Sequence, residues 1–165
     1  MLNNLMDMIN GLKERDLMNG INANDINELG FVLIRNNFIL SMYGMAIGGL
    51  FIANEEMVGK PNIPMIIVDD VFYEFSKNSR SFIIAHELGH RQHEVQTEGY
   101  VRKINDEFEA DEYGAKLIGV DNAIKALNDI KQTLMKKYFM EATDEGIKEI
   151  DIRIENLINK FMVTC

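Results

Sequence analysis

The sequence predicts an α+β fold, with a few strands between an N-terminal helix and a helical C-terminal half. One observation is the continuous apolar run Met65–Val68, which follows Pro61 and Pro64 and ends at Asp69-Asp70, as a buried strand would. The other is that apolar residues beyond this strand recur at helical spacing. Strands followed only by helices indicate an α+β domain.

The N-terminal residues are predicted to form an amphipathic helix. Its apolar side would consist of Leu2, Leu5, Met6, Ile9 and Leu12. The same segment carries Asp7 and lacks the basic region of a signal peptide. Further on, Asp25 and Glu28 have the spacing of a capping box. They precede an apolar stretch that includes Leu29, Val32 and Leu33, so a second helix is expected there.

The stretch Phe38–Asn54 carries no charged residue. It is shorter than the roughly 20 apolar residues that a membrane span needs, and it contains three glycines. We therefore expect a buried hairpin or a pair of core strands. A membrane-attached protein, anchored by Phe38–Ala53, is the alternative.

The remaining elements follow from breaks in the apolar pattern. Val71–Phe75 is expected to form a short helical turn. A helix should then run from about Ser81 past His93, with Asn78 or Ser79 as its cap. Three further helices complete the chain: about Arg102 to Ile118 with Gly119 as its stop, one capped by Asp121, and one after Asp144. The apolar faces of the last two would be Ala123, Leu127, Ile130, Leu134 and Tyr138, and Ile147, Ile150, Ile154, Leu157 and Phe161.

Length and composition indicate one domain that spans residues 1–165, since 47% of the residues are hydrophobic and can form a core. The chain has 17 basic and 26 acidic residues and a net charge of −9, which argues against a nucleic-acid partner. The single cysteine, Cys165, cannot form an internal disulfide, so we expect a cytoplasmic protein. We expect no membrane partner, and the oligomeric state is left open.

The pentapeptide HELGH is the most informative motif in the chain. His86 and His90 are four residues apart, so a helix places both imidazoles on one face, where they can bind one Zn²⁺ ion. Glu87 follows the first histidine and would lie beside the metal rather than on it. The motif therefore predicts a zinc-dependent endopeptidase in which Glu87 activates a metal-bound water for attack on a peptide bond.

A catalytic zinc site needs a third protein ligand. The three-histidine pattern HExxHxxGxxH is absent, because positions 93 and 96 are His and Gln. Glu107 and Asp111 are four apart and share a helix face, so Glu107 is expected to bind the metal while Asp111 orients a histidine. Glu109 is the second choice for the third ligand and His93 is the third choice.

These residues resemble the gluzincin metallopeptidases, in which HExxH is followed by ExxxD. Within that group the chain is most similar to the type I CAAX prenyl proteases and bacterial heat-shock membrane proteases. The similar stretches lie between about Ile63 and Leu157: IIVDDVFYEFSKNSRSFIIAHELGH, EFEADEYGAKL and IDIRIENL. The resemblance implies a zincin-like fold, with a small mixed sheet packed on the active-site helix and an all-helical C-terminal half. It also implies one zinc ion per chain on His86, His90 and Glu107, and a sheet edge at Met65–Val68 that binds substrate backbone.

The chain also departs from that family. A His-Pro pair, which commonly precedes the C-terminal arginine segment, is replaced by ATDEGIKEIDIR. The group that stabilises the transition state is therefore open. Arg153 would either act catalytically on the oxyanion or form a structural salt bridge. A second gluzincin group, small bacterial and phage-borne peptidases that cleave repressor-like regulators, shares HELGH and ExEA[ND].

The sequence therefore leaves three functions open. Two of them are peptidases, which would act on a protein or peptide substrate. The first is a minimal zinc endopeptidase, in either of the forms that the two gluzincin groups suggest. The second is a non-catalytic module stabilised by zinc, for which His93 would be the fourth ligand. The third is the membrane-attached protease described above.

Overall fold

The computed structural model describes five stretches of the chain: residues 2–15, 23–42, 47–53, 63–93 and 103–163. They form two compact units, one of Met1–Met6 with Ser76–Cys165 and the other of Asp7–Phe75. The predicted N-terminal helix is present as α1, Leu2–Asn10, and contributes residues to both units.

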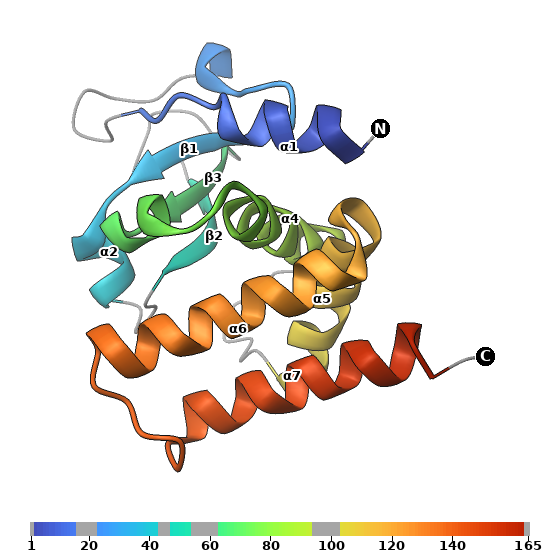
Figure 1. Ribbon diagram of the computed structural model, residues 1–165. Coiled ribbons are helices and arrows are strands. Elements are labelled where there is room, and N and C mark those ends of the chain that lie inside the picture. The colour runs from blue at the N-terminus through green and yellow to red at the C-terminus, as the bar shows by residue number, and fades with distance from the viewer. Residues whose placement is uncertain (1, 16–22, 43–46, 54–62, 94–102, 164–165) are drawn as a thin grey trace. The chain divides into compact units, whose positions relative to one another are not determined.

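The unit Asp7–Phe75 contains a three-stranded mixed sheet in the order β1-β3-β2 (Figure 1). β1 (Val32–Arg35) runs parallel to β3 (Ile63–Val68), whereas β2 (Gly48–Ala53) runs antiparallel to it. The mixed sheet that was expected is thus confirmed.

β3 is the central strand of this sheet. All six of its residues are buried, which is typical of a strand with both faces covered. Both of its edges are hydrogen-bonded, to β1 and to β2, so the prediction that Met65–Val68 forms a free substrate-binding edge is wrong. The strand ends as expected: Asp69 accepts a hydrogen bond from the Val71 amide at 2.9 Å and begins the helical turn η3, Asp70–Glu74.

The helix predicted after Asp25 is not formed. Instead Ala23–Asp25 is a single 3₁₀ turn, η2, and the apolar residues that follow belong to β1. The Asn27 side chain accepts a hydrogen bond from the Leu29 amide at 2.9 Å, and Gly30 has a φ of 85°. This turn, together with the β-branched residues of β1, outweighs the capping-box spacing.

The uncharged stretch forms one helix and one strand rather than two strands. α2 spans Asn37–Met42 and β2 spans Gly48–Ala53, while residues 43–46 and Asn54 lie outside the described residues. The prediction was therefore right for β2 and wrong for α2. Within the described part of the chain, no helix is long and apolar enough to cross a membrane.

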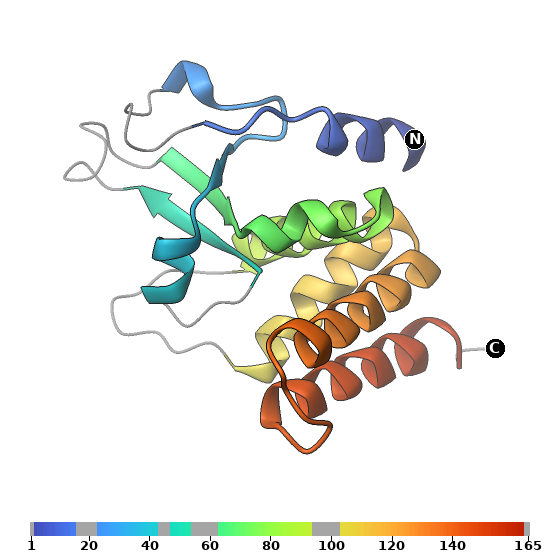
Figure 2. The same ribbon diagram turned by 60° about the vertical axis from the view of Figure 1, so that its left-hand side comes forward.

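The other unit contains the expected helical C-terminal half (Figures 1 and 2). The helices are α4 (Lys77–His93), α5 (Ile104–Ile118), α6 (Val120–Lys137) and α7 (Glu145–Phe161). α5 contacts α4, α6 and α7, and α6 also contacts α4 and α7. The four predicted helices are confirmed, with α4 beginning four residues earlier than expected.

The N-terminal caps of α4 and α6 differ from the predicted ones. Ser76 caps α4, since its hydroxyl accepts the Ser79 amide at 3.3 Å and its carbonyl accepts the Arg80 amide at 3.0 Å. Gly119, with a φ of 92°, ends α5 as predicted, and it also directly precedes α6. Asp121, the expected cap, therefore lies within the first turn of α6.

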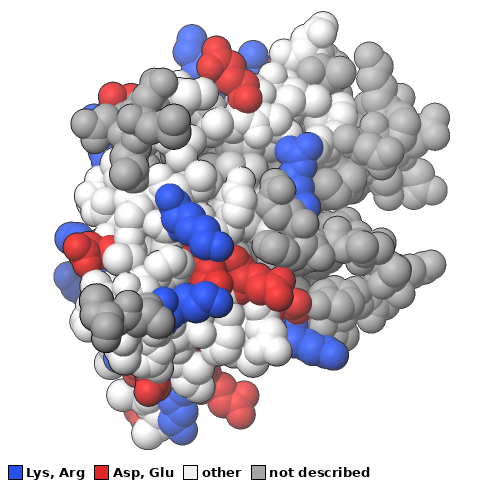
Figure 3. Space-filling model, turned by 90° about the vertical axis from the view of Figure 1, so that its right-hand side faces the viewer, with Lys and Arg blue, Asp and Glu red and all other residues white. Residues whose placement is uncertain are grey.

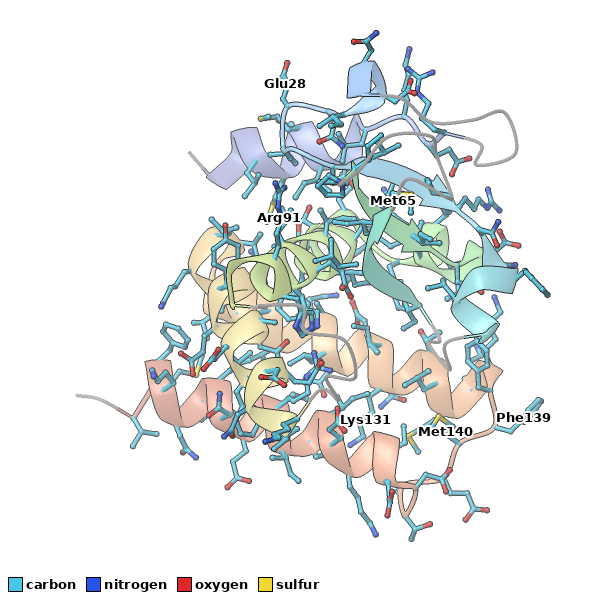
Figure 4. All side chains as sticks on the ribbon, turned by 180° about the vertical axis from the view of Figure 1, so that it is seen from behind. Glu28, Met65, Arg91, Lys131, Phe139 and Met140 are labelled. Atoms are coloured by element: carbon cyan, nitrogen blue, oxygen red, sulfur yellow. The ribbon has the colours of Figure 1, made fainter. Side chains whose placement is uncertain are left out.

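The apolar faces of α6 and α7 are largely those predicted. The buried residues include Ala123, Leu127, Leu134, Ile147, Ile150 and Leu157. Tyr138 instead caps the end of α6 and is exposed. The two helices are also joined by an ion pair between Lys131 and Asp151 at 2.6 Å, and Phe139 points outward from the turn between them (Figure 4).

Replacing Ser76 by alanine should destabilise the unit that contains α4. The substitution removes the acceptor of the Ser79 amide, so the free energy of unfolding should fall by about 1 kcal/mol in a denaturant titration. Ser76→Asp retains an acceptor and serves as the control. Equal stability of Ser76→Ala and the unchanged chain would contradict this role.

Candidate metal centre

Two histidines of α4 form the first half of the site. His86 and His90 are buried, and their Nε2 atoms lie 3.0 Å apart on one face of the helix. The rings are nearly perpendicular, with an interplanar angle of 88°. The spacing of four residues thus brings both imidazoles to one point, as the sequence predicts.

Glu107 of α5 completes the cluster. Its Oε2 lies 3.3 Å from the His86 Nε2, and its Oε1 lies 3.3 Å from the His90 Nε2. The three side chains offer one ligand atom each, all close enough together to hold a metal ion. No further His, Cys, Asp or Glu joins the cluster within the part of the chain that the structure describes.

Close packing of α4 against α5 brings Glu107 to the histidines. A Cβ atom on Gly89 would lie 2.8 Å from the Ala110 Cα and 2.9 Å from its carbonyl oxygen. One on Gly114 would lie 3.1 Å from the Phe82 ring and 3.4 Å from the His86 amide nitrogen. Position 89 therefore requires glycine, whereas a side chain at Gly114 would fit only if the Phe82 ring moved. Gly89 permits this approach from α4, and Gly114 is the small residue that faces α4 from α5.

Asp111 lies one turn after Glu107 on the same face of α5 and is fully buried. Its Oδ1 is 2.7 Å from the His86 Nδ1. Because a carboxylate can only accept, the imidazole nitrogen must carry the proton. This contact directs the His86 Nε2 toward Glu107 and His90, which is the orienting role expected for Asp111.

Arg153 of α7 lies against the carboxylates of Glu107 and Asp111. Its Nε and Nη2 donate to the two Asp111 oxygens at 2.7 Å each, a bidentate pair. Its Nη1 lies 3.3 Å from the Glu107 Oε2. Of the two roles expected for Arg153, these contacts favour the structural salt bridge over a catalytic one.

The charges of the cluster shift one another's pKa values. Burial alone would lower the pKa of His86, but the Asp111 and Glu107 carboxylates outweigh it and raise that pKa to about 9. Burial would raise the pKa of Glu107, yet the hydrogen bonds from the two histidines and the charge of Arg153 hold it far below its usual range. The pKa of Asp111 is lowered despite burial, mainly by Arg153.

Glu87 lies between the two histidines in sequence and is 5% exposed. Its Oε2 is buried and has no hydrogen-bond partner among the described residues. Buried polar atoms nearly always have a partner, which is protein, water or a bound ion. This buried carboxylate, next in sequence to a candidate metal ligand, thus has an oxygen that no described residue occupies and that a bound molecule could contact.

Of the other candidate ligands, Glu109 is exposed on α5 and does not join the cluster, whereas the side chain of His93 lies outside the described residues. The contribution of Gly114 and the bidentate contact of Arg153 were not foreseen. The pair Ala110 and Gly114, four apart on the face of α5 that carries Asp111, is the signal that could have indicated a close helix contact.

Comparisons with protein-family models, curated proteins and solved structures give no match to this chain. Its function is therefore inferred from the geometry of the metal centre.

Replacing Gly89 by alanine should separate α4 from α5. The added methyl group would overlap backbone atoms of Ala110, so the free energy of unfolding should fall by about 1–3 kcal/mol and metal binding should weaken. Gly146→Ala places the same group 3.0 Å from the end of the flexible Met140 side chain and is the matched control. Unchanged stability and metal affinity in Gly89→Ala would contradict the close contact.

Metal affinity should depend on pH through His86. Its pKa of about 9 in the metal-free chain means that it carries a proton that the metal must displace at neutral pH. Between pH 6.5 and 8.5, the affinity for Co²⁺ should rise about tenfold per pH unit, and one proton should be released per ion bound. Calorimetry in buffers of different ionisation enthalpy measures both, and affinity that is constant over this range would contradict the assignment.

Proposed function

We propose that this chain is a zinc-dependent endopeptidase in which Glu87 is the general base. One observation carries the proposal: directly after His86 of the His-His-Glu cluster comes a buried carboxylate, Glu87, with an oxygen that has no hydrogen-bond partner among the described residues. The resemblance to gluzincins in HELGH and ExxxD supports the same function.

Zinc fits the donor set of this cluster. Two imidazoles and one carboxylate are a common combination in catalytic zinc sites, which keep a fourth position open. Ligand atoms about 2.0–2.1 Å from a tetrahedral zinc ion lie roughly 3.3 Å from one another. The two Nε2 atoms lie 3.0 Å apart, and each lies 3.3 Å from one Glu107 oxygen, Oε2 for His86 and Oε1 for His90, which is close to that spacing.

A divalent ion would also balance the charge of the site. The carboxylates of Glu87, Glu107 and Asp111, together with the guanidinium of Arg153, have a net charge of −2 when the histidines are neutral. All four side chains are buried or nearly so. Because uncompensated charge is costly in such a place, a doubly charged cation suits the site better than a monovalent one.

The roles of the residues follow from these positions. Bound zinc would lower the pKa of a water in the open position and polarise the carbonyl of the scissile bond. Glu87 would accept the proton of the attacking water and return it to the leaving amine. Asp111 would keep the His86 tautomer fixed during this exchange.

The proposed substrate is a protein or peptide, and a repressor-like regulator is the more specific form of this proposal. On the face shown in Figure 3, basic side chains are interspersed with acidic ones rather than gathered into one stripe. Together with the net charge of −9, this supports a polypeptide substrate over a nucleic acid. The exposed acidic residues would favour peptides with basic side chains.

A purified sample should hydrolyse an unstructured protein such as casein, and a chelator should abolish the activity. Glu87→Gln should lower kcat at least 100-fold while it retains zinc, because the substitution removes the base but none of the three ligands. Glu109→Gln removes an exposed carboxylate from α5 and is the matched control. Equal activity of Glu87→Gln and the unchanged chain would rule out the proposed base. Zinc bound tightly without any hydrolysis would instead favour the non-catalytic module.

A further inference from the structure

The C-terminal helix reaches the metal centre through one buried charged side chain. Arg153 lies in the middle of α7, between the buried residues Ile150 and Leu157, and its side chain is only 13% exposed. The same face of α7 therefore packs into the core of this unit and delivers a guanidinium to the carboxylates of α5. The two histidines of the cluster belong to α4 and Glu107 belongs to α5. The helix α7 therefore supplies none of the three ligands.

We propose that Arg153 is a positioning residue that holds two of the three metal ligands in place, so that metal binding and the docking of α7 stabilise each other. The inference rests on the metal site of the proposed function and goes beyond it, because it assigns a role to a helix that does not touch the metal. Through Asp111, Arg153 acts on His86, and through its Nη1 it acts on Glu107 directly.

The geometry of the guanidinium explains how one side chain can fix the positions of both His86 and Glu107. Its Nε and Nη2 bind the two oxygens of Asp111 in parallel, which fixes the plane of the guanidinium relative to α5. The remaining nitrogen, Nη1, then points to the Glu107 oxygen that also lies nearest the His86 Nε2. A shift of α7 would therefore move Asp111 and Glu107 together.

A second ion pair between the same two helices provides a contrast. Lys160 of α7 lies 3.2 Å from the Glu112 Oε2, but the lysine is 56% exposed. Neither Lys160 nor Glu112 is part of the cluster, and exposed pairs contribute little to stability. This pair joins the same two helices without acting on the ligands, so its removal is the reference for losing an ion pair between α5 and α7 that is remote from the cluster.

The coupling must act in both directions. A bound metal ion orders Glu107 and His86, and through His86 it orders Asp111, so it presents Arg153 with carboxylates that are already in place. Any gain in metal affinity that docked α7 provides must equal the gain in docking that the metal provides. Metal binding should therefore stabilise α7, although no atom of this helix is a ligand.

Zinc affinity of two variants tests the positioning role. Arg153→Lys keeps the charge but cannot bind Asp111 in a bidentate manner and reach Glu107 as well, so zinc affinity should fall roughly 10- to 100-fold. Lys160→Met, the control, should stay within about twofold. The Co²⁺ absorption spectrum should change in Arg153→Lys, since the ligand geometry is altered, and remain unchanged in Lys160→Met. Equal affinity and spectra for both variants would overturn the proposal.

Hydrogen exchange on the unchanged chain tests the coupling without any substitution. Added zinc should slow amide exchange in α4 and α5, and also in the central part of α7 around Arg153. No residue of α6 belongs to the cluster, so the amides of this helix are the internal reference. Protection of α4 and α5 with no change in α7 beyond that in α6 would overturn the inference.

These measurements use zinc or Co²⁺ alone, so they do not depend on peptidase activity. Zinc that protects α7 in a chain with no hydrolytic activity would support this inference and overturn the proposed function. If zinc binds and supports hydrolysis but leaves hydrogen exchange in α7 unchanged, the proposed function would be supported and this inference overturned. A chain that binds no zinc would overturn both.

Discussion

At Gly89 the backbones of α4 and α5 approach so closely that no side chain fits between them, and Gly114 of α5 lies directly against the Phe82 ring of α4. This contact sets the distance between the helix that carries both histidines and the helix that carries Glu107 and Asp111. Histidine rings and carboxylates are short groups, and a metal ion tolerates little variation in ligand position. The tight helix contact is therefore the condition on which the candidate metal centre depends, and a larger residue at Gly89 would disturb it.

The same contact buries an unusual concentration of charge. Asp111 is fully buried, and a buried carboxylate without compensation would oppose folding. Arg153, which belongs to α7, offsets part of this negative charge. A proton on His86 offsets a further part of it when no metal is bound. A cation that bound to this cluster would take the place of the His86 proton. The charges that stabilise the packing of α4, α5 and α7 are therefore the same charges that a bound metal ion would meet.

Local features of this site were predictable from the sequence, whereas long-range contacts were not. His86 and His90 share a face because of helical spacing alone, and the spacing of Glu107 and Asp111 likewise defines one face of α5. The strand order, by contrast, depends on pairing between distant segments, so the place of β3 at the centre of the sheet could not be derived from its apolar run. The contacts of Arg153 are also long-range, since they depend on how α7 packs.

The most direct measurement is the anomalous diffraction of a crystal grown with zinc, recorded on both sides of the zinc absorption edge. The metal centre described above predicts one strong anomalous peak per chain, about 2.0–2.2 Å from the His86 Nε2, the His90 Nε2 and a Glu107 oxygen. The fourth position would hold water or a solvent molecule next to Glu87. A crystal without a peak at these residues, or with a fourth protein ligand in that position, would contradict a catalytic metal centre.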